Sequence, residues 1–361
     1  MKKRERMTPE FSPKRNDRKN FQRRILSWYD VHRRDLPWRV NRDPYRVWLS
    51  EIMLQQTRVA AVIAHYHEFL RRFPTVDKLA AAREASVLAA WSGLGYYRRA
   101  RMLHAAARVI VREHRGKFPS TAESLLQLPG IGRYTAAAIA SIAFDEPTAV
   151  VDGNVERVLQ RVSGRRLAGE ELWAAANHLL DAKRPGDFNQ AMMELGATVC
   201  TPRTPTCLTC PVIELCATRG ELAATSKPVP QKKREIHYTL SCRDGEVLLV
   251  QRARDASLMP GMWELPECVP SGPVPTTQQV SPARLGGGRN DKRKGKLDKT
   301  DRTPGAPVTL RHSITITDYT VHVRRSAAPL GAAGKWTPVR RLRQVALTGL
   351  ARKILRASDI I

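Results

Sequence analysis

The chain has 361 residues, and its 61 Lys and Arg outnumber 34 Asp and Glu to give a formal net charge of +27. This excess is larger than solubility requires, and it predicts a polyanionic partner such as nucleic acid. No apolar run approaches the roughly 20 residues that span a bilayer, so a membrane protein is not expected. The charged, proline-containing start of the chain differs from a secretory signal, and the length suits about two domains.

The first part of the chain has mainly the period of α-helices. Alanine-rich amphipathic runs, such as residues 76–91 and 98–114, are separated by Gly and Pro turns, which predicts a mainly α domain over residues 21–225. Residues 1–20 are rich in Lys and Arg and predict a disordered basic tail. Residues 226–235 combine basic residues with proline and are predicted to form a linker.

Beyond the linker the hydrophobic period changes to two, which predicts a smaller α/β domain over residues 236–361. An Asp-Gly turn at residues 244–245 is expected to join two of its strands as a hairpin. About residues 270–307 have almost no apolar content and predict a disordered insertion. The expected strands and closing helix cover residues 236–243, 246–252, 308–316, 319–325 and 343–356.

A helix predicted over residues 47–58 carries a single carboxylate, Glu51. Glu51 and Gln55 lie four residues apart at the border of an apolar arc. A carboxylic acid half removed from water is pushed toward its protonated form, which a general acid needs near neutral pH. The alternative is an ordinary solvent-facing helix glutamate. The apolar arc comprises Tyr45, Trp48, Ile52, Val59 and Ile63.

A second carboxylate, Asp152, ends a short apolar run immediately before another predicted helix. The simplest interpretation is a helix N-cap. The functional alternative is a carboxylate that helix amides keep ionised, facing the cationic centre formed when a glycosidic bond breaks. One acid with a raised pKa and one with a lowered pKa is the usual division of labour in such chemistry.

A glycine turn between two helices is predicted at residues 128–135 (LPGIGRYT). Gly130 and Gly132 would expose backbone N–H groups at a helix N-terminus, with Arg133 beside them, which suits one DNA phosphate. A packing turn between helices is the alternative. A capping box of Ser120 with Glu123 is expected to start the short helix before this turn.

Residues 93–97 (GLGYY) place another glycine turn before a helix, with two arginines directly following. A tyrosine at this turn would wedge between stacked bases while the arginines hold the DNA backbone. For one of the two tyrosines, burial in the core is the competing interpretation.

Four cysteines, Cys200, Cys207, Cys210 and Cys216, lie close together with intervening spacings of six, two and five residues. Four thiolates so spaced predict one metal centre in a reducing compartment. Zinc and an iron-sulfur cluster both remain open on spacing alone. Zinc sites tend to have two short pairs, and the single short pair here favours the cluster.

Five motifs occur in order before the cysteines, at residues 48–57 (WLSEIMLQQT), 93–97 (GLGYY), 128–135 (LPGIGRYT), 151–155 (VDGNV) and 188–196 (FNQAMMELG). Together with the cysteine run, they resemble MutY-type adenine DNA glycosylases of the helix-hairpin-helix superfamily, over about residues 25–220. The resemblance implies a two-lobed helical domain with DNA across the hairpin and the target adenine flipped into a cleft. It also implies that the four cysteines hold a [4Fe-4S] cluster with a structural and DNA-binding role.

The resemblance also implies roles for individual residues. Glu51 would protonate the adenine N7, and Asp152 would stabilise the oxocarbenium-like sugar, directly or through a transient covalent bond. In the related endonuclease III family, a lysine at the position of Tyr134 forms a Schiff base that cuts the strand, so base removal without efficient strand cleavage is expected here. Tyr134 and Asn154 would support the sugar centre, Gln56 and Tyr96 would fill or wedge the base stack, and Arg39 and Glu194 would line the adenine pocket.

The strand domain is similar to the Nudix-like domain by which this family senses 8-oxoguanine opposite adenine, notably at residues 258–266 (LMPGMWELP). A Nudix hydrolase needs several glutamates for its metal ions, and none follows Glu267, so recognition without hydrolysis is expected. The family often has Phe-Ser-His where this chain has Ile314, Thr315 and Ile316. Only the hydroxyl is kept, which makes Thr315 the expected contact with the lesion.

The resemblance therefore implies a monofunctional, monomeric adenine DNA glycosylase that acts on duplex DNA with adenine opposite 8-oxoguanine or guanine. The alternatives are a bifunctional glycosylase and lyase, or a DNA-binding protein without catalytic activity that has a structural metal site. The expected location is a bacterial-type cytoplasm at the nucleoid, with a nucleus or mitochondrion left open. The basic tail and the insertion are candidate docking segments for repair or clamp partners.

Overall fold

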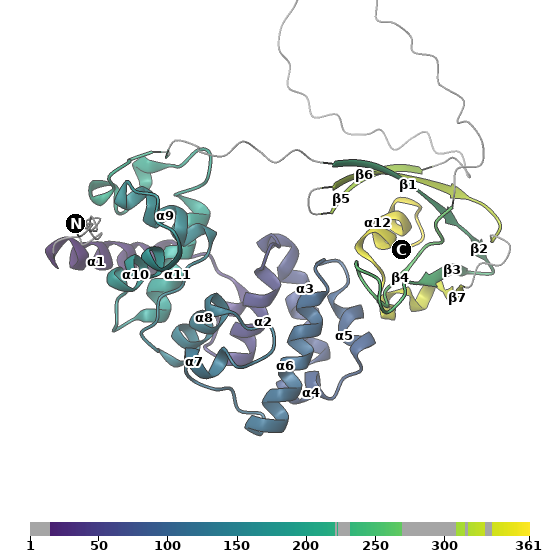
Figure 1. Cartoon of the computed structure of the whole chain (residues 1–361), viewed down its shortest axis with the longest axis horizontal. Helices are drawn as coiled ribbons and strands as arrows, with labels where there is room; N and C mark the ends of the chain where they lie inside the picture. Colours follow the sequence, from purple (N-terminus) through teal and green to yellow (C-terminus); the bar gives the residue numbers. More distant parts are fainter. Residues whose placement is uncertain (1–14, 221, 223–231, 269–307, 315–316, 329–333) are drawn as a thin grey trace, which may run out of the picture. The chain divides into compact units, whose positions relative to one another are not determined.

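The computed structural model describes residues 15–220, 222, 232–268, 308–314, 317–328 and 334–361 (Figure 1). The chain divides into two compact units, Met1–Lys227 and Pro228–Ile361, which we describe separately. Residues 1–14 of the predicted tail, most of the predicted linker, the predicted insertion and Thr315 lie outside the described residues. No described helix is long and apolar enough to cross a membrane.

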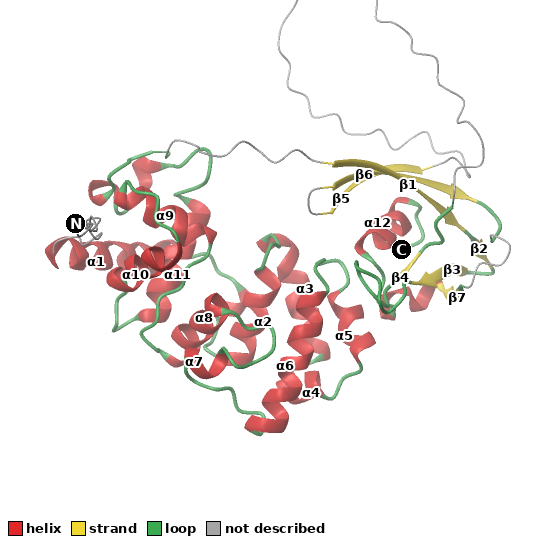
Figure 2. Cartoon of the chain, in the orientation of Figure 1, coloured by secondary structure: helices red, strands yellow, loops and turns green. Residues whose placement is uncertain are grey.

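The described part of the first unit is built from helices (Figure 2). They are α1 (Arg15–His32), α2 (Pro44–Leu54), α3 (Val59–Arg72), α4 (Val76–Ala80), α5 (Glu84–Trp91), α6 (Arg98–His114), α7 (Ala122–Leu125), α8 (Arg133–Phe144), α9 (Gly153–Ser163), α10 (Gly169–Leu179) and α11 (Pro185–Thr198). Short 3-10 turns occupy Pro37–Arg39, Cys207–Thr209 and Ile213–Leu215. The predicted mainly α fold is therefore confirmed for this unit.

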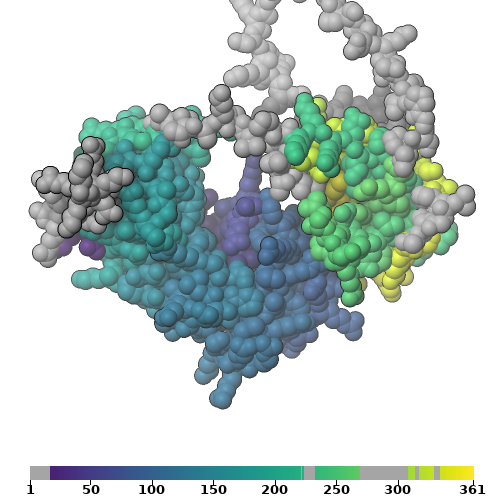
Figure 3. Space-filling model, viewed as in Figure 1, coloured from purple at the N-terminus to yellow at the C-terminus, as the bar shows by residue number. Residues whose placement is uncertain are grey.

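The helices form two groups that α8 joins. One group packs α1 with α9, α10 and α11 around a core that includes Ile25, Leu159 and Phe188. In the other group α2 packs against α3, α6 and α8. Helix α8 also contacts α11, and a Cβ atom added to Gly186 would lie only 2.6 Å from the carbonyl oxygen of Ser141, so these two helices approach backbone to backbone. In the space-filling view, purple atoms from early in the chain lie between the teal and blue helices (Figure 3).

Two predicted helix boundaries near the start of the chain were wrong. Helix α1 begins at Arg15, so residues 15–20, predicted to be disordered, are helical. Gln22 ties this helix to the end of α10, because its Nε2 donates to the carbonyls of Leu179 (3.1 Å) and Leu180 (2.8 Å). The predicted run 76–91 is two helices, since Arg83 has an extended backbone that separates α4 from α5.

Two further helix ends also differ from the prediction. Helix α2 stops at Leu54 because Gln55 has a ψ of 114°, so Val59 and Ile63 belong to α3 and not to the arc around Glu51. Helix α7 is capped by Thr121, whose hydroxyl accepts from the backbone N–H of Ser124 at 3.2 Å, and not by Ser120.

The second unit combines strands with one α-helix among its described residues. The strands are β1 (Lys232–Leu240), β2 (Cys242–Arg243), β3 (Glu246–Gln251), β4 (Trp263–Glu264), β5 (Val308–Ile314), β6 (Thr317–Arg325) and β7 (Lys335–Pro338), followed by a 3-10 turn at Val339–Gln344 and α12 (Gly349–Ala357). One sheet has the order β1-β6-β5, and in the other β3 pairs with β2, β4 and β7. Tyr238, Val321 and Leu350 contribute to their shared core.

The predicted pair of strands β5 and β6 is confirmed as an antiparallel ladder from Val308↔Val323 to Ile314↔Thr317. The predicted hairpin at residues 244–245 is only partly present, because only the two residues of β2 pair with β3. Strand β1 instead pairs in parallel with β6, which places its alternate apolar side chains in the core.

The closing helix starts later than predicted, at Gly349 and not at residue 343. Strand β4 holds the preceding segment extended, since Trp263 N–H donates to the Ala346 carbonyl and Thr348 N–H donates to the Trp263 carbonyl, both at 2.9 Å. Thr348 then caps α12 by accepting from the N–H of Ala351 at 3.1 Å.

Candidate active site

Glu51 lies on α2 and is 6% exposed. Helix α2 starts at Pro44, where the Asp43 carboxylate accepts from the N–H of Arg46, and this start sets the face on which Glu51 lies. The Tyr134 hydroxyl, from the first turn of α8, donates to Glu51 Oε2 at 2.5 Å. Burial raises the pKa of Glu51 to about 7, although the hydrogen bond from Tyr134 opposes the rise. Glu51 is therefore a carboxylic acid that can give up a proton near neutral pH.

Tyr134 joins three helices at this point, because its hydroxyl also lies 3.5 Å from the Met193 sulfur on α11. Burial, together with the negative charges of Glu51 and Asp152, raises the pKa of Tyr134 well above its ordinary value. The phenol thus keeps its proton and acts as a hydrogen-bond donor to Glu51.

Asp152 is the N-cap of α9, as the simpler sequence interpretation predicted. Its Oδ1 accepts from the N–H groups of Asn154 (2.9 Å) and Val155 (2.8 Å), and its Oδ2 accepts from Asn154 Nδ2 at 2.8 Å. Its negative charge also contributes to the raised pKa of Glu51. The two predicted acids therefore interact electrostatically, and Asp152 combines this interaction with its role as a helix cap.

Arg157 links the Asp152 cap to the cysteine loop. Its Nη2 donates to Asn154 Oδ1 at 2.8 Å, and its Nε donates to the Cys200 carbonyl at 2.7 Å. Arg157 was missed in the sequence, although its position one turn after Asn154 on the same helix was a usable signal.

Glu194 is paired with two arginines and is 1% exposed. Arg34 contacts it through Nε (2.6 Å) and Nη2 (2.9 Å), and Arg39 contacts it through Nη2 (2.8 Å). Burial opposes ionisation, but the hydrogen bonds from Arg34 and Arg39 lower the pKa of Glu194 to about 2. Arg39 Nε is buried without a hydrogen-bond partner among the described residues. The structure brings together the predicted pair Arg39 and Glu194, and it adds Arg34, for which the sequence offered no signal.

The glycine turn before α8 has the predicted form. Gly130 has a φ of +73°, and a Cβ atom there would lie 2.4 Å from the Met102 Cβ, so the turn is both a left-handed bend and a packing contact. Gly132 is the N-cap of α8, whose first N–H groups have no acceptor within the helix. Arg133 is exposed, pairs with Glu170 at 2.5 Å and lies 4.0 Å over the Trp173 ring.

Gln56 and Tyr96 are both exposed and both have left-handed backbones, with φ values of 56° and 48°. Such conformations are strained for residues other than glycine and persist where the surroundings hold them. Tyr97, in contrast, is 3% exposed, so one of the two tyrosines is in the core.

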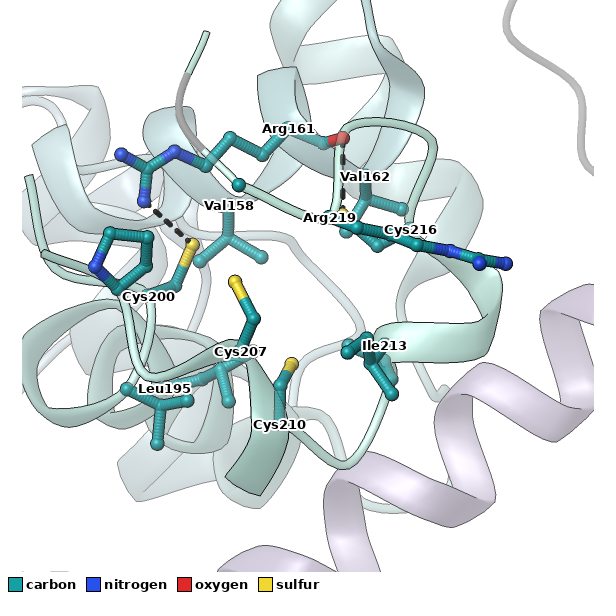
Figure 4. Close-up of a pocket in the computed structure, with 14 residues that line it drawn as sticks. Val158, Arg161, Val162, Leu195, Cys200, Cys207, Cys210, Ile213, Cys216 and Arg219 are labelled. Carbon is teal, nitrogen blue, oxygen red and sulfur yellow. Dashed lines mark hydrogen bonds between the residues drawn. The ribbon is translucent and has the colours of Figure 1, made fainter.

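The four predicted metal-binding cysteines line one pocket, together with apolar side chains such as Val158 and Ile213 (Figure 4). Arg161 borders the pocket, because its Nη1 lies 3.3 Å from the Cys200 sulfur and its carbonyl accepts from the Cys216 thiol at 3.3 Å. Four thiols in an apolar pocket beside a guanidinium fit an anionic metal-thiolate cluster. The four cysteines are Cys200, Cys207, Cys210 and Cys216.

The two-lobed helical unit, with its glycine turn, buried acid and four-cysteine pocket, defines the class of helix-hairpin-helix DNA repair proteins. The family model described as HhH-GPD superfamily base excision DNA repair protein matches residues 49–174. The helical unit therefore contains a domain of this superfamily, and the chain is similar to adenine DNA glycosylases.

Curated and solved proteins are similar to part of this chain. The chain is 54% identical over 211 residues to the adenine DNA glycosylase of Rattus norvegicus, covering 54% of this chain and 41% of the relative. It is 39% identical over 305 residues to the adenine DNA glycosylase of Arabidopsis thaliana, covering 70% of this chain and 48% of the relative. A solved thermostable thymine-DNA glycosylase is 32% identical with a TM-score of 0.54, covering 56% of this chain and 97% of that chain. The chain thus spans less than half the length of these two curated relatives.

Proposed function

We propose that this protein is an adenine DNA glycosylase that removes adenine paired with 8-oxoguanine or guanine in duplex DNA. The observation that carries the proposal is the buried Glu51, whose pKa is raised to about 7. The names of the similar proteins support adenine as the base. Solubility alone does not call for the net charge of +27, which suits a DNA substrate.

In the proposed reaction the Glu51 carboxylic acid donates its proton to N7 of the extruded adenine. The N-glycosidic bond then breaks, its electron pair leaves with the base, and positive charge develops on the sugar. The Asp152 carboxylate, which Asn154 and two helix amides hold in place, stabilises that charge until water adds to the sugar carbon. The water's proton passes to the Glu51 carboxylate, which restores the acid. Tyr134 orients the acid through its hydrogen bond to Glu51.

The proposed enzyme is monofunctional. Strand cleavage by the endonuclease III route needs an amine that forms a Schiff base with the sugar, and Tyr134 offers none. Its hydroxyl is committed to Glu51 and keeps its proton because its pKa is raised. A bifunctional glycosylase and lyase is therefore the disfavoured alternative.

Cys200, Cys207, Cys210 and Cys216 would hold a [4Fe-4S] cluster that acts as a structural staple for the loop after α11. The cluster would fix the Cys200 carbonyl, to which Arg157 donates, and so stabilise the residues around the Asp152 cap. No step of base removal passes through the cluster.

For the second unit we propose a Nudix-like recognition role without hydrolysis. Glu264 is paired with Arg252 at 2.6 Å, and the Tyr238 hydroxyl lies 3.5 Å from Glu267. Glu264 is therefore committed to an arginine, and no glutamate follows Glu267 in the sequence. Thr315, which lies outside the described residues, is the proposed contact with 8-oxoguanine.

The decisive experiment incubates the holoprotein with duplexes that carry adenine opposite each normal base or 8-oxoguanine. Strands are then resolved with and without alkali, which cuts at abasic sites. Alkali-dependent cutting at adenine, strongest opposite 8-oxoguanine and guanine, supports the proposal. Cutting without alkali, with a borohydride-trapped adduct in high yield, would establish the bifunctional alternative, and no cutting would refute base removal.

A further inference from the structure

Arg99, in the first turn of α6, holds two separate segments of the helical unit together. Its Nη1 donates to the carbonyls of Ile52 (2.7 Å), Met53 (3.0 Å) and Gln55 (2.5 Å). Its Nη2 donates to the carbonyls of Leu94 and Gly95, both at 3.2 Å, and to the Thr57 hydroxyl at 3.1 Å. The guanidinium also lies 5.4 Å from the Trp91 ring centroid and 5.5 Å from that of Tyr96.

The first of these segments is the C-terminal end of α2. The last carbonyls of a helix have no partner within the helix and form its negative pole, so a cation that donates to them stabilises the end. Ile52, one of the acceptors, directly follows Glu51 in the sequence. Arg99 therefore fixes the end of the helix that carries the proposed general acid.

The second segment is the turn at residues 93–97, which presents Tyr96. Gln56 and Tyr96, one in each segment, are exposed and have strained left-handed backbones. The Gln55 carbonyl and the Thr57 hydroxyl, on either side of Gln56, accept from the Arg99 guanidinium. The Gly95 carbonyl, directly before Tyr96, accepts from the same guanidinium. One half-buried cation thus stabilises both strained positions, and an ammonium, with fewer donors and no planar fork, would not reach all six acceptors.

We propose that Arg99 is a positioning residue that makes the end of α2 and the 93–97 turn a single rigid body. Entry of Gln56 and Tyr96 into the base stack then brings Glu51 to the extruded adenine in the same movement. This inference rests on the proposed function, because it assigns the coupling between base extrusion and proton donation at that site.

The test compares Arg99→Lys with Arg101→Lys, a control on the same helix whose side chain pairs with Glu84 at 3.0 Å at the surface. Amide hydrogen exchange of the DNA-free holoprotein comes first. We expect Arg99→Lys to speed exchange at residues 55–57 and 94–96 together by about tenfold or more, with α8 unchanged. Faster exchange in only one segment, or in neither, would overturn the proposal.

The second measurement uses duplexes with the fluorescent base 2-aminopurine in place of adenine, together with single-turnover adenine release against pH. Arg99→Lys should lower base extrusion by about tenfold or more, while the pH midpoint set by Glu51 stays near that of the wild type. Unchanged extrusion, or a loss that merely equals the unfolded fraction, would overturn the coupling. If Arg99→Lys fails to fold, Thr57→Ala removes one acceptor and should loosen the same two segments to a smaller degree.

These measurements separate the two proposals. If the wild type releases no adenine, the proposed function fails, whereas the exchange experiment still tests whether Arg99 joins the two segments.

Discussion

Glu51→Gln tests the proposed acid directly, because it keeps the shape of the side chain and removes the proton. With a pKa of about 7, roughly half of the wild-type Glu51 side chains carry a proton at pH 7. A positioned general acid contributes about 100- to 10,000-fold, and we expect adenine release to fall by that factor. Single-turnover release, revealed by alkali, measures this loss.

The same substitution should stabilise the fold at high pH. Burial raises the pKa of Glu51 from 4.5 to about 7, so the folded state binds more protons than the unfolded state within that window. The free energy of unfolding therefore falls as pH rises through this window. Above the window, the buried Glu51 carboxylate lowers the free energy of unfolding by roughly 3 kcal/mol at most. Gln carries no such cost, so Glu51→Gln should melt several degrees higher at pH 9.

Calorimetry at pH 5 and pH 9 checks this second effect, with Glu170→Gln as an exposed control that should show little difference. A Glu51→Gln protein that loses activity without gaining stability at pH 9 would show that Glu51 is not a buried acid. A fully active Glu51→Gln protein would show that the proton comes from another group.

Four other substitutions test separate parts of the proposal. Tyr134→Phe removes a hydrogen bond that lowers the pKa of Glu51, so the alkaline limb of the pH–rate profile should move to higher pH; an unmoved limb would contradict the contact. Glu194→Gln leaves Arg34 and Arg39 without their counter-charge and should cost roughly 3 kcal/mol in urea unfolding, whereas a loss below 1 kcal/mol would mean that the pair is solvated. Cys207→Ser should lower soluble yield, visible charge-transfer absorption and DNA binding before it lowers the rate of bond cleavage in the remaining folded protein. Thr315→Ala should reduce release opposite 8-oxoguanine more than opposite guanine, and equal losses would remove Thr315 from recognition.

Local sequence patterns predicted those features that depend on neighbouring residues. The spacing of the four cysteines indicated a shared site, and their side chains do line one pocket. The glycines before α8 indicated a turn, since Gly130 requires a left-handed backbone that other residues rarely adopt. Alternation of apolar residues predicted β5 and β6 because side chains of a strand point to opposite faces.

Other features were decided by contacts between distant segments. The prediction that Val59 lies on the same helix as Glu51 was wrong. Helix α2 ends at Leu54, where Arg99 from α6 donates to carbonyls of its last turn. The parallel pairing of β1 with β6 also escaped prediction, since the partner strand lies some eighty residues away.

The sequence by itself determined the helical and strand-rich units, the clustered thiols and the presence of an acid on an apolar helix. Only the tertiary structure decided that this acid is almost fully buried and accepts a hydrogen bond from Tyr134. Its pKa near 7 follows from desolvation, from the hydrogen bond that Tyr134 of α8 donates, and from the charges of Asp152 and Arg39. These are properties of the packed arrangement, because a glutamate in an isolated helix would be hydrated and fully ionised at the same pH.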